Sequence, residues 1–243
     1  MKKGVQKIYT EVAHSYDLVN HIMTLGLDIL WRKTAARTAR DLSPLRLLDI
    51  CCGTGDMAVE FSRRVPPGAH IFGVDFSQPM LRVAAGKTYA SNAEFVLADV
   101  GSLPFPSDVF DMLTISFATR NLNSSSEVLV GFFQEFCRVL KPGGVFVHLE
   151  TSQPRLRPLR SLFHAYVRSI VRPLGSRLSG SAAGYKYLAH TVPRFHSAKE
   201  LSALLSQAGY SRVEFRPFLF HIAALHTAWK PDRAAPEPFR PRA

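Results

Sequence analysis

The sequence is poor in cysteine and in long apolar runs. Only three of its 243 residues are cysteine, and two of these, Cys51 and Cys52, are adjacent, which excludes a disulfide framework. No C-x-x-C or Cys/His spacing indicates a metal site. No stretch approaches the about 18 apolar residues of a membrane-spanning helix, and no apolar run follows the basic start to make a signal peptide. We therefore expect a reduced, cytoplasmic setting and no metal.

Acidic residues are also scarce. Nineteen Asp and Glu face thirty Lys and Arg, so the formal net charge is +11 and the isoelectric point is near 9.9. This imbalance suits a polyanionic partner, an anionic membrane surface or no specific partner. An apolar fraction of 47% and a charged fraction of 20% are ordinary for a globular chain, and the length allows one α/β domain with a large core.

The stretch from Leu47 to Asp56 predicts a buried strand, a tight loop and the start of a helix. Apolar residues lead into Asp49, and Gly53 and Gly55 follow in the loop. Glycine lets the backbone approach a ligand that a Cβ would exclude, and the helix behind presents free N–H groups. A plain strand-to-helix turn has the same pattern, because short glycine motifs give many false positives.

A second apolar strand, expected at residues 69–75, ends in Asp75 about 20 residues beyond the glycine loop, where a carboxylate can bind both hydroxyls of a ribose. Dinucleotide enzymes and S-adenosylmethionine (SAM) enzymes share this arrangement. Here the loop lacks the third glycine of a dinucleotide site, and the acids Asp49 and Asp56 flank it. Two acids favour a cationic ligand over a pyrophosphate. SAM, which carries an ammonium and a sulfonium, is the better candidate.

The alternation of strand and helix patterns from residue 45 onward predicts a doubly wound, mostly parallel α/β sheet. Further strands are expected at 94–99, 110–116 and 145–150, with a helix at 124–140 that the breakers at 141–144 end. Two last strands, at 213–220 and 222–229, are expected to be antiparallel.

Three regions lie outside this alternation. Residues 1–41 predict an N-terminal helical arm that either packs on residues 42–230 or forms a lid, with Tyr16, Asp17 and Asn20 able to point inward. Residues 155–190 predict a helical insertion with alternating arginines and apolar residues, around a small, flexible stretch at 175–184. It could cover an active site, lie on anionic lipid or present a solvated basic face. Residues 231–243 are expected to be disordered.

Taken together, these features resemble class I SAM-dependent methyltransferases. More narrowly, the chain resembles the ubiquinone/menaquinone-biosynthesis C-methyltransferase family from about Tyr9 to Lys230. The most family-specific matches are Tyr-Asp-Leu-Val-Asn at 16–20 and Ile-Ser-Phe-Ala-Thr-Arg-Asn at 115–121. Other matching stretches are Gly26 with 31–32, 53–56, 138–144 with 149–150 and 152, 185–188 and 224–226. The glycine loop alone is specific only for the class.

The resemblance implies a Rossmann-like methyltransferase sheet with an antiparallel C-terminal strand, SAM as cofactor and a prenylated hydroquinone as acceptor. The reaction would convert demethylmenaquinol to menaquinol, or methylate the equivalent ubiquinone precursor. The implied cofactor-binding residues are Asp49, Gly53, Thr54, Gly55, Asp75, Phe76, Asp99, Val100 and Ser116. The implied catalytic residues are Arg120, which would stabilise a phenolate, and Tyr16, Asn20 and Asn121, which would orient the ring or a water.

The chain departs from the family pattern mainly on the expected acceptor side. Cys51 replaces the first glycine of the class motif, residues 118–119 and Thr151 differ, and Lys186 replaces an arginine, losing its planar fork. Another small molecule or RNA thus stays an alternative acceptor, and a SAM-binding protein without turnover is the non-enzymatic alternative. We expect no nucleic acid, because residues 116–121 lack the signature of amino methylation. We also consider that the protein contacts an anionic membrane surface and that it forms a homodimer.

Overall fold

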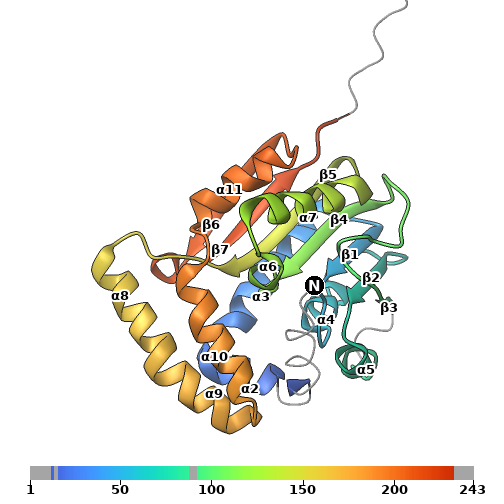
Figure 1. The fold of residues 1–243 in the computed structure, drawn as a ribbon. Coiled ribbons are helices and arrows are strands. Elements are labelled where there is room, and N and C mark those ends of the chain that lie inside the picture. The colour runs from blue at the N-terminus through green and yellow to red at the C-terminus, as the bar shows by residue number, and fades with distance from the viewer. Residues whose placement is uncertain (1–11, 14–15, 88–91, 233–243) are drawn as a thin grey trace, which may run out of the picture.

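Seven strands form one mixed sheet in the order β3-β2-β1-β4-β5-β7-β6 (Figure 1). The computed structural model describes residues 12–13, 16–87 and 92–232. The first five strands pair in parallel, whereas β7 is antiparallel to both β5 and β6. The strands are β1 (Arg46–Ile50), β2 (His70–Asp75), β3 (Ala93–Leu97), β4 (Phe110–Ser116), β5 (Leu140–Thr151), β6 (Arg212–Phe218) and β7 (Ala223–Trp229). The predicted doubly wound sheet with an antiparallel C-terminal strand is confirmed.

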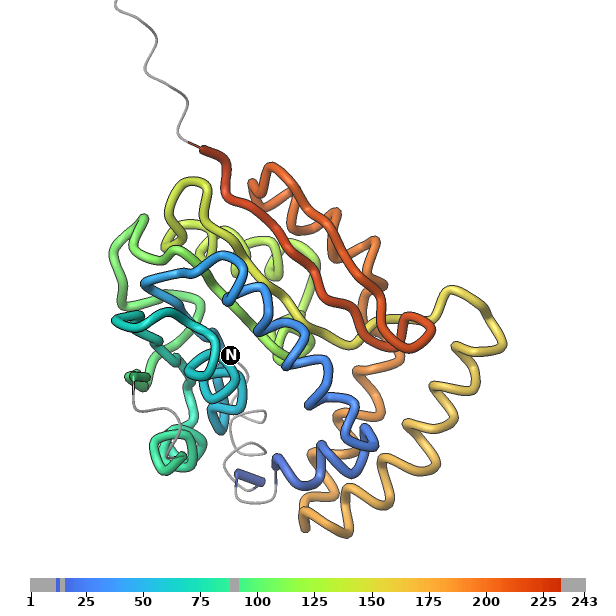
Figure 2. The backbone as a smooth tube through the Cα atoms, turned by 180° about the vertical axis from the view of Figure 1, so that it is seen from behind, coloured from blue at the N-terminus to red at the C-terminus, as the bar shows by residue number. Residues whose placement is uncertain are grey.

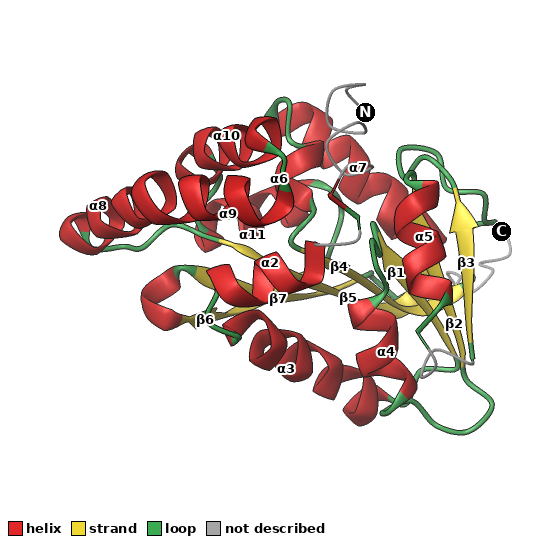
Figure 3. Cartoon of the chain, turned by 90° about the horizontal axis from the view of Figure 1, so that it is seen from below, coloured by secondary structure: helices red, strands yellow, loops and turns green. Residues whose placement is uncertain are grey.

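Helices cover both faces of this sheet, as Figure 3 shows. One face packs on α3 (Leu27–Leu42) and α4 (Asp56–Ser62), and the other packs on α7 (Ser126–Val139) and α11 (Ala198–Gln207). The strand residues are apolar on both sides because each face is buried. The remaining helices of the described core are α2 (Tyr16–Met23), α5 (Gln78–Ala85) and α6 (Thr119–Leu122), with a short turn η2 (Val192–Arg194) before α11 and another, η3 (Leu219–His221), between β6 and β7.

Residues 157–191 form a helical cap beside the sheet. It consists of α8 (Arg157–Tyr166), η1 (Val167–Val171), α9 (Arg172–Ser179) and α10 (Ala182–Thr191). Val19 and Met23 of α2 are buried against Val171 and Tyr185 of this cap. Figures 1 and 2 view the molecule from opposite sides, and both place α2 beside the cap. Helix α2 and the cap therefore pack on each other.

Two local predictions are wrong. The stretch at 175–184 is not a flexible segment, because α9 contains Gly175, and only Gly180, at φ 73°, and Ser181 separate α9 from α10. A Cβ at Gly175 would overlap the ring of Tyr185, so the glycine allows α9 and α10 to pack closely. The fifth strand is expected to begin at residue 145, after the breakers at 141–144, but it begins before them, at Leu140. Phe110 pairs with Leu140 and Met112 with Val145, so the breakers form a bulge inside β5.

The predicted disordered tail lies, from residue 233 on, outside the described residues. Lys230 is described and ties the end of β7 to the sheet, because its ammonium donates to Asp108 at 2.7 Å and to the carbonyl of Leu140 at 2.7 Å. Within the described part of the chain, no helix has the length and apolar character that crossing a membrane requires.

Candidate active site

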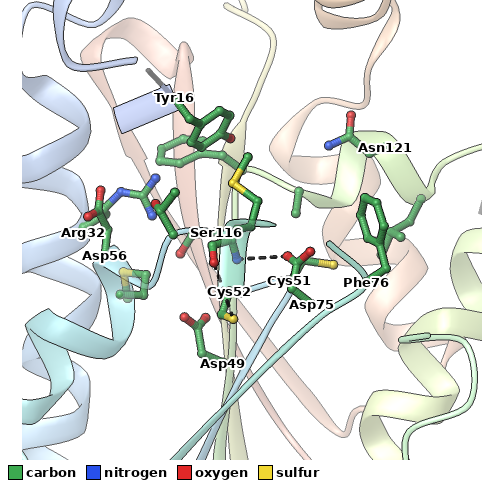
Figure 4. A pocket seen from close by; sticks show the side chains of 17 residues that line it. Tyr16, Arg32, Asp49, Cys51, Cys52, Asp56, Asp75, Phe76, Ser116 and Asn121 are labelled. Atoms are coloured by element: carbon green, nitrogen blue, oxygen red, sulfur yellow. Dashed lines mark hydrogen bonds between the residues drawn. The ribbon is translucent and has the colours of Figure 1, made fainter. Parts of the chain in front are cut away.

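A cavity opens at the carboxyl ends of β1, β2 and β4, where ligands bind in open α/β sheets. We call it the polar cavity, and it encloses about 630 Å³, open solvent included. Figure 4 shows its walls. They are formed by Tyr16, Arg32, Asp49, Cys51, Cys52, Gly53, Thr54, Asp56, Met57, Asp75, Phe76, Met80, Ser116, Phe117, Ala118, Asn121 and Leu122. Six of the nine predicted cofactor residues are thus brought together, and Gly55, Asp99 and Val100 are not among them.

Asp75 is held in place by the backbone of two loops. Its Oδ2 accepts a hydrogen bond from the N–H of Gly53 at 2.9 Å, and its Oδ1 accepts one from the N–H of Ser77 at 2.8 Å. Burial raises the pKa of Asp75, and these backbone N–H groups lower it. Each carboxylate oxygen can accept a further hydrogen bond. The carboxylate is therefore oriented on the cavity wall and can still bind a pair of hydroxyls.

The two loop glycines have different tasks. An added Cβ at Gly53 would meet no atom within 4 Å, so this position leaves space at the cavity. At Gly55 a Cβ would come within 2.9 Å of the Cβ of Ala84. Both glycines have positive φ, and so does Cys51, at 53°. The first loop position therefore keeps the backbone conformation that favours glycine, although the chain has cysteine there.

The electrostatics of the polar cavity suit a cation. Asp49 is buried, its Oδ2 has no hydrogen-bond partner in the described chain, and burial raises its pKa to about 8, against the opposing effect of Arg32. The hydroxyl of Ser116 is likewise buried without a partner among the described residues. An unpartnered buried carboxylate is costly unless a positive group pairs with it. The cavity therefore fits the ammonium and sulfonium of SAM.

Asp99 and Val100 lie beyond the end of β3. Asp99 is exposed, and its Oδ1 accepts a hydrogen bond from the N–H of Gly101 at 2.9 Å. Val100 is buried in the hydrophobic core. Their role as cofactor-binding residues stays a prediction.

A second, larger cavity lies between α2, α3 and the helical cap. We call it the apolar cavity, and it encloses about 1440 Å³, open solvent included. Most of its walls are apolar or aromatic: Val12, Met23, Leu25, Leu27, Trp31, Phe117, Phe163, Tyr166, Val167, Val171, Tyr185, Tyr187, Leu188, Val192, Leu219 and Ile222. Such a lining suits a large apolar ligand.

Arg120 and Glu150 place charge inside the apolar cavity. Arg120 is 8% exposed, its Nη1 donates to the hydroxyl of Thr191 at 2.6 Å, and its guanidinium carbon lies 5.9 Å from the ring centre of Tyr187. Its Nε has no hydrogen-bond partner in the described chain. Glu150 accepts hydrogen bonds from the N–H and hydroxyl of Thr151, and burial raises its pKa while Arg120 lowers it. Arg120 thus keeps a donor for an acceptor oxygen in the cavity.

The two cavities meet at Tyr16, Arg32 and Phe117, which line both. Burial raises the pKa of Tyr16, while Arg32 and the amide of Asn20 lower it. Phe117 has φ 56°, an unfavourable value for a bulky residue. The four predicted catalytic residues therefore divide: Tyr16 stands at the junction, Arg120 and Asn20 line the apolar cavity, and Asn121 lines the polar cavity.

Sequence reasoning gave no role to Arg32, Glu150 or Thr191. A signal for Arg32 exists, because it falls on the helical face that also carries Trp31 and Ala35, and both of these are buried. A charged residue on an apolar face is exceptional unless it is paired or functional. No local pattern marks Thr191, which reaches Arg120 only through the packing of the cap.

The chain has clear relatives. A sequence model of the ubiE/COQ5 methyltransferase family matches residues 1–230. A demethylmenaquinone methyltransferase of Anoxybacillus flavithermus is 35% identical, over 95% of this chain and 97% of the relative. A protein of Geobacter sulfurreducens named ubiquinone/menaquinone biosynthesis C-methyltransferase UbiE is 36% identical, over 93% of this chain and 88% of the relative.

A solved structure supports the fold independently. The crystal structure of a SAM-dependent methyltransferase from Aquifex aeolicus superposes with a TM-score of 0.54 at 16% identity, covering 76% of this chain and 81% of that one. Its similarity concerns the architecture of sheet and helices.

Proposed function

The chain belongs to the ubiE/COQ5 methyltransferase family, and from that premise we propose that it transfers the methyl group of SAM to a ring carbon of a prenylated hydroquinone, with demethylmenaquinol as the first candidate. The observation that carries the proposal is the junction at Tyr16, Arg32 and Phe117. There a polar cavity suited to a cationic cofactor meets an apolar cavity large enough for a ring with an isoprenoid tail.

When bound, SAM supplies an electrophilic methyl group on a positively charged sulfur. The polar cavity offers groups for each part of it. Asp75 would accept hydrogen bonds from the ribose hydroxyls, Asp49 would attract the positive charges, and Gly53 leaves space for close approach. Thr54, Phe76 and Ser116 lie on the same wall. Because SAM is already activated, the protein mainly has to align donor and acceptor.

The acceptor carbon becomes nucleophilic when the neighbouring hydroxyl of the hydroquinone ionises. The guanidinium of Arg120 would stabilise the resulting phenolate, which develops in a cavity where a charge interaction is strong. Glu150, on the same wall and with a raised pKa, would take up the hydroxyl proton, directly or through a water. The attacked carbon then loses its own proton to restore the aromatic ring, and the phenolate oxygen takes back the proton that Glu150 received, so one proton in total is released for each methyl group transferred.

Tyr16 and Asn20 are placed to orient the ring from the α2 side of the apolar cavity. Asn121 faces the polar cavity and would act from the donor side. The isoprenoid tail would lie along the cap residues of the apolar cavity, among them Phe163, Val167 and Leu188.

The outer face of the cap supports contact with an anionic membrane that delivers the quinol. Ile170 and Leu174 are 49% and 38% exposed, one helical turn apart. Arg168 and Arg172 are exposed on the same stretch. Exposed apolar and basic side chains on one helical segment are a combination typical of helices that lie in a lipid headgroup region. We place the enzyme on the cytoplasmic side, in peripheral contact with that surface.

The deciding experiment is a methyl-transfer assay with labelled SAM. Its acceptors are chemically reduced demethylmenaquinol, a benzoquinol precursor of ubiquinone and bulk RNA. Wild type is compared with Arg120→Ala, and with Arg194→Ala as a matched control from the exposed surface of the cap region. SAM binding is measured separately by calorimetry.

We expect label in one quinol, its loss in Arg120→Ala with SAM binding retained, and no loss in Arg194→Ala. Label in RNA alone would refute the quinol as the acceptor, although the protein would still be a methyltransferase. SAM binding without transfer to any acceptor would favour a protein that acts by association.

A further inference from the structure

His148, on β5, is a buried histidine that the proposed reaction leaves without a task. Its side chain is 0% exposed. The rings of Phe133, Phe146 and His226 surround it, with centres 5.9, 5.9 and 5.3 Å from its own. Burial and the neighbouring His226 lower the pKa of His148 well below its ordinary value, so the ring is neutral. A neutral imidazole still carries one donor and one acceptor, and burying these groups without partners is costly.

The one hydrogen bond of the His148 ring within the described chain goes to Thr119. Its Nε2 lies 2.8 Å from the hydroxyl oxygen of Thr119, whereas its Nδ1 has no partner among the described residues. Thr119 is also 0% exposed. Because water does not reach either side chain, nothing replaces this hydrogen bond when one partner is removed.

Thr119 is the first residue of α6, a helix of four residues that ends at Leu122. So short a helix has little stability of its own, and no side chain caps its N-terminus. Glu150, two residues after His148 on β5, accepts a hydrogen bond from the N–H of Arg120 at 3.3 Å. Alternate residues of a strand point to the same face, so His148 and Glu150 hold the first turn of α6 from one face of β5.

We infer that His148 is a positioning residue for Arg120, because it fixes Thr119 and with it the start of α6. The backbone of Arg120 is held from β5, and its guanidinium is held from the cap by the hydroxyl of Thr191. The inference rests on the proposed function for the task of Arg120. A displacement of α6 by about 1 Å would move the guanidinium away from the acceptor oxygen, and such a misplacement can cost about a hundredfold in rate.

The test uses variants that remove the hydrogen bond in different ways. Thr119→Val replaces the hydroxyl by a methyl group of similar size, and Thr119→Ser keeps a hydroxyl. Thr119→Val combined with His148→Leu makes both partners apolar. Thr114→Val is the matched control, since Thr114 in β4 is also 0% exposed and its hydroxyl has no partner in the described chain. Each variant is measured by methyl transfer to reduced demethylmenaquinol, by calorimetry with S-adenosylhomocysteine and by urea unfolding.

In Thr119→Val we expect kcat to fall about tenfold, as for a lost hydrogen bond that leaves its buried partner unsatisfied. The KM for the quinol and the affinity for S-adenosylhomocysteine should stay unchanged. Thr119→Ser and Thr114→Val should keep the wild-type kcat. The double variant should recover the urea midpoint of wild type but not its kcat, because an apolar contact restores packing without fixing an orientation.

A second comparison asks whether the effect passes through Arg120. In an Arg120→Ala background, the further exchange Thr119→Val should leave the residual rate unchanged, because the side chain to be positioned is absent. A further tenfold fall in that background would mean that Thr119 affects the rate by another route, and it would overturn the inference. An equal loss of kcat in Thr114→Val, or a kcat that recovers together with stability in the double variant, would also overturn it.

Hydrogen exchange separates this inference from the proposed function. The amides of residues 119–122 should exchange faster in Thr119→Val than in wild type, and those of residues 126–139 in α7 should not. Unchanged exchange together with unchanged kcat would refute the positioning role and leave quinol methylation intact. A wild type that methylates no quinol would refute the proposed function and with it the catalytic task of Arg120, whereas the exchange result would still show whether His148 and Thr119 fix α6.

Discussion

The hydroxyl of Thr54, in the loop after β1, donates a hydrogen bond to Asp17 in α2. Lys87 strengthens this contact, because its ammonium donates to Asp17 at 2.9 Å and also to Asp56. The N-terminal helix is therefore fastened to the glycine loop on one side and packed on the helical cap on the other. This supports packing over a free lid, while Tyr16 of the same helix still lines both cavities.

Removing this contact should weaken cofactor binding. In Asp17→Ala we expect the affinity for S-adenosylhomocysteine to fall about tenfold, since one charge-assisted contact is worth roughly 1.5 kcal/mol and α2 carries part of the cavity wall. Calorimetry measures the affinity, and hydrogen exchange over residues 16–23 should rise. Asp41→Ala, an exposed site at the end of α3, is the control. Unchanged affinity together with unchanged exchange would show that the contact is incidental.

Cofactor binding should depend on pH through Asp49. Its pKa is raised to about 8 in the ligand-free chain, and a bound ammonium favours the charged carboxylate. Below pH 8, binding should therefore release a proton, and affinity should rise by up to about tenfold per pH unit. The charged groups that act on Asp49 are Arg32, Asp75 and Asp56. Calorimetry in buffers of different ionisation enthalpy measures the proton release.

Asp49→Asn should lose most of this dependence, leaving the smaller contribution of Asp75, whose pKa is also raised. The same shift has a consequence for stability. Because the folded chain holds the proton of Asp49 more tightly than the unfolded chain, the ligand-free fold should lose a few kcal/mol as pH rises from about 4 to 8. A steeper fall in Asp49→Asn than in wild type would contradict this assignment.

Thr191 should act as a positioning residue for Arg120. Its hydroxyl accepts from Nη1 of Arg120 at 2.6 Å and donates to the carbonyl of Tyr187 at 2.9 Å. In Thr191→Val the guanidinium loses its anchor, and we expect kcat to fall about tenfold, by the loss of one hydrogen bond to a charged group. Cofactor affinity should stay unchanged, and Thr191→Ser should restore kcat. A loss in the serine variant equal to that in the valine variant would indicate disturbed packing instead.

The cap should need glycine at position 175 for its stability, whereas another glycine inside a helix, Gly131, should be replaceable. In Gly175→Ala the new methyl group meets the ring of Tyr185, and overpacking of this kind costs about 1–3 kcal/mol. Gly131, inside α7, has no atom within 4 Å of an added Cβ, so Gly131→Ala should add about 0.5–1 kcal/mol. Urea unfolding measures whether the free energy of unfolding falls in Gly175→Ala and rises in Gly131→Ala. Equal changes in the two variants would disprove the role of the Tyr185 contact.

The outer face of the cap should bind anionic vesicles. Exchanging Ile170 and Leu174 for serine removes apolar contact, and we expect binding to phosphatidylglycerol vesicles to weaken at least about tenfold. Exchanging Arg168 and Arg172 for glutamine should weaken binding mainly at low salt, by about 1 kcal/mol for each charge. Sedimentation with vesicles measures both. Exchanging Leu42 at the end of α3 and Leu45 before β1, both exposed, for serine is the control, and an equal loss there would argue against a specific membrane face.

The sequence by itself determined the order of strands and helices, the class of cofactor and the family. These depend on patterns that are local in the chain: apolar runs that end in acids, a loop with Gly53, and the motif around Arg120. Six predicted cofactor residues share one cavity for that reason, because parallel strands bring their carboxyl ends to one edge of the sheet. Apolar residues that recur every 2 residues indicate a strand and those that recur every 3.6 residues indicate a helix, so the sequence shows the order of these elements directly.

The tertiary structure alone decided which residues meet across long separations. Asp17 reaches Thr54 and Lys87, and Thr191 reaches Arg120 across 71 positions of sequence. It also showed that Gly55 lies against Ala84 and that Gly175 belongs to a helix, where the sequence predicts ligand approach and flexibility. Such contacts depend on how helices pack on the sheet and on each other. That packing follows from the sum of many small burial energies, and no local pattern records it.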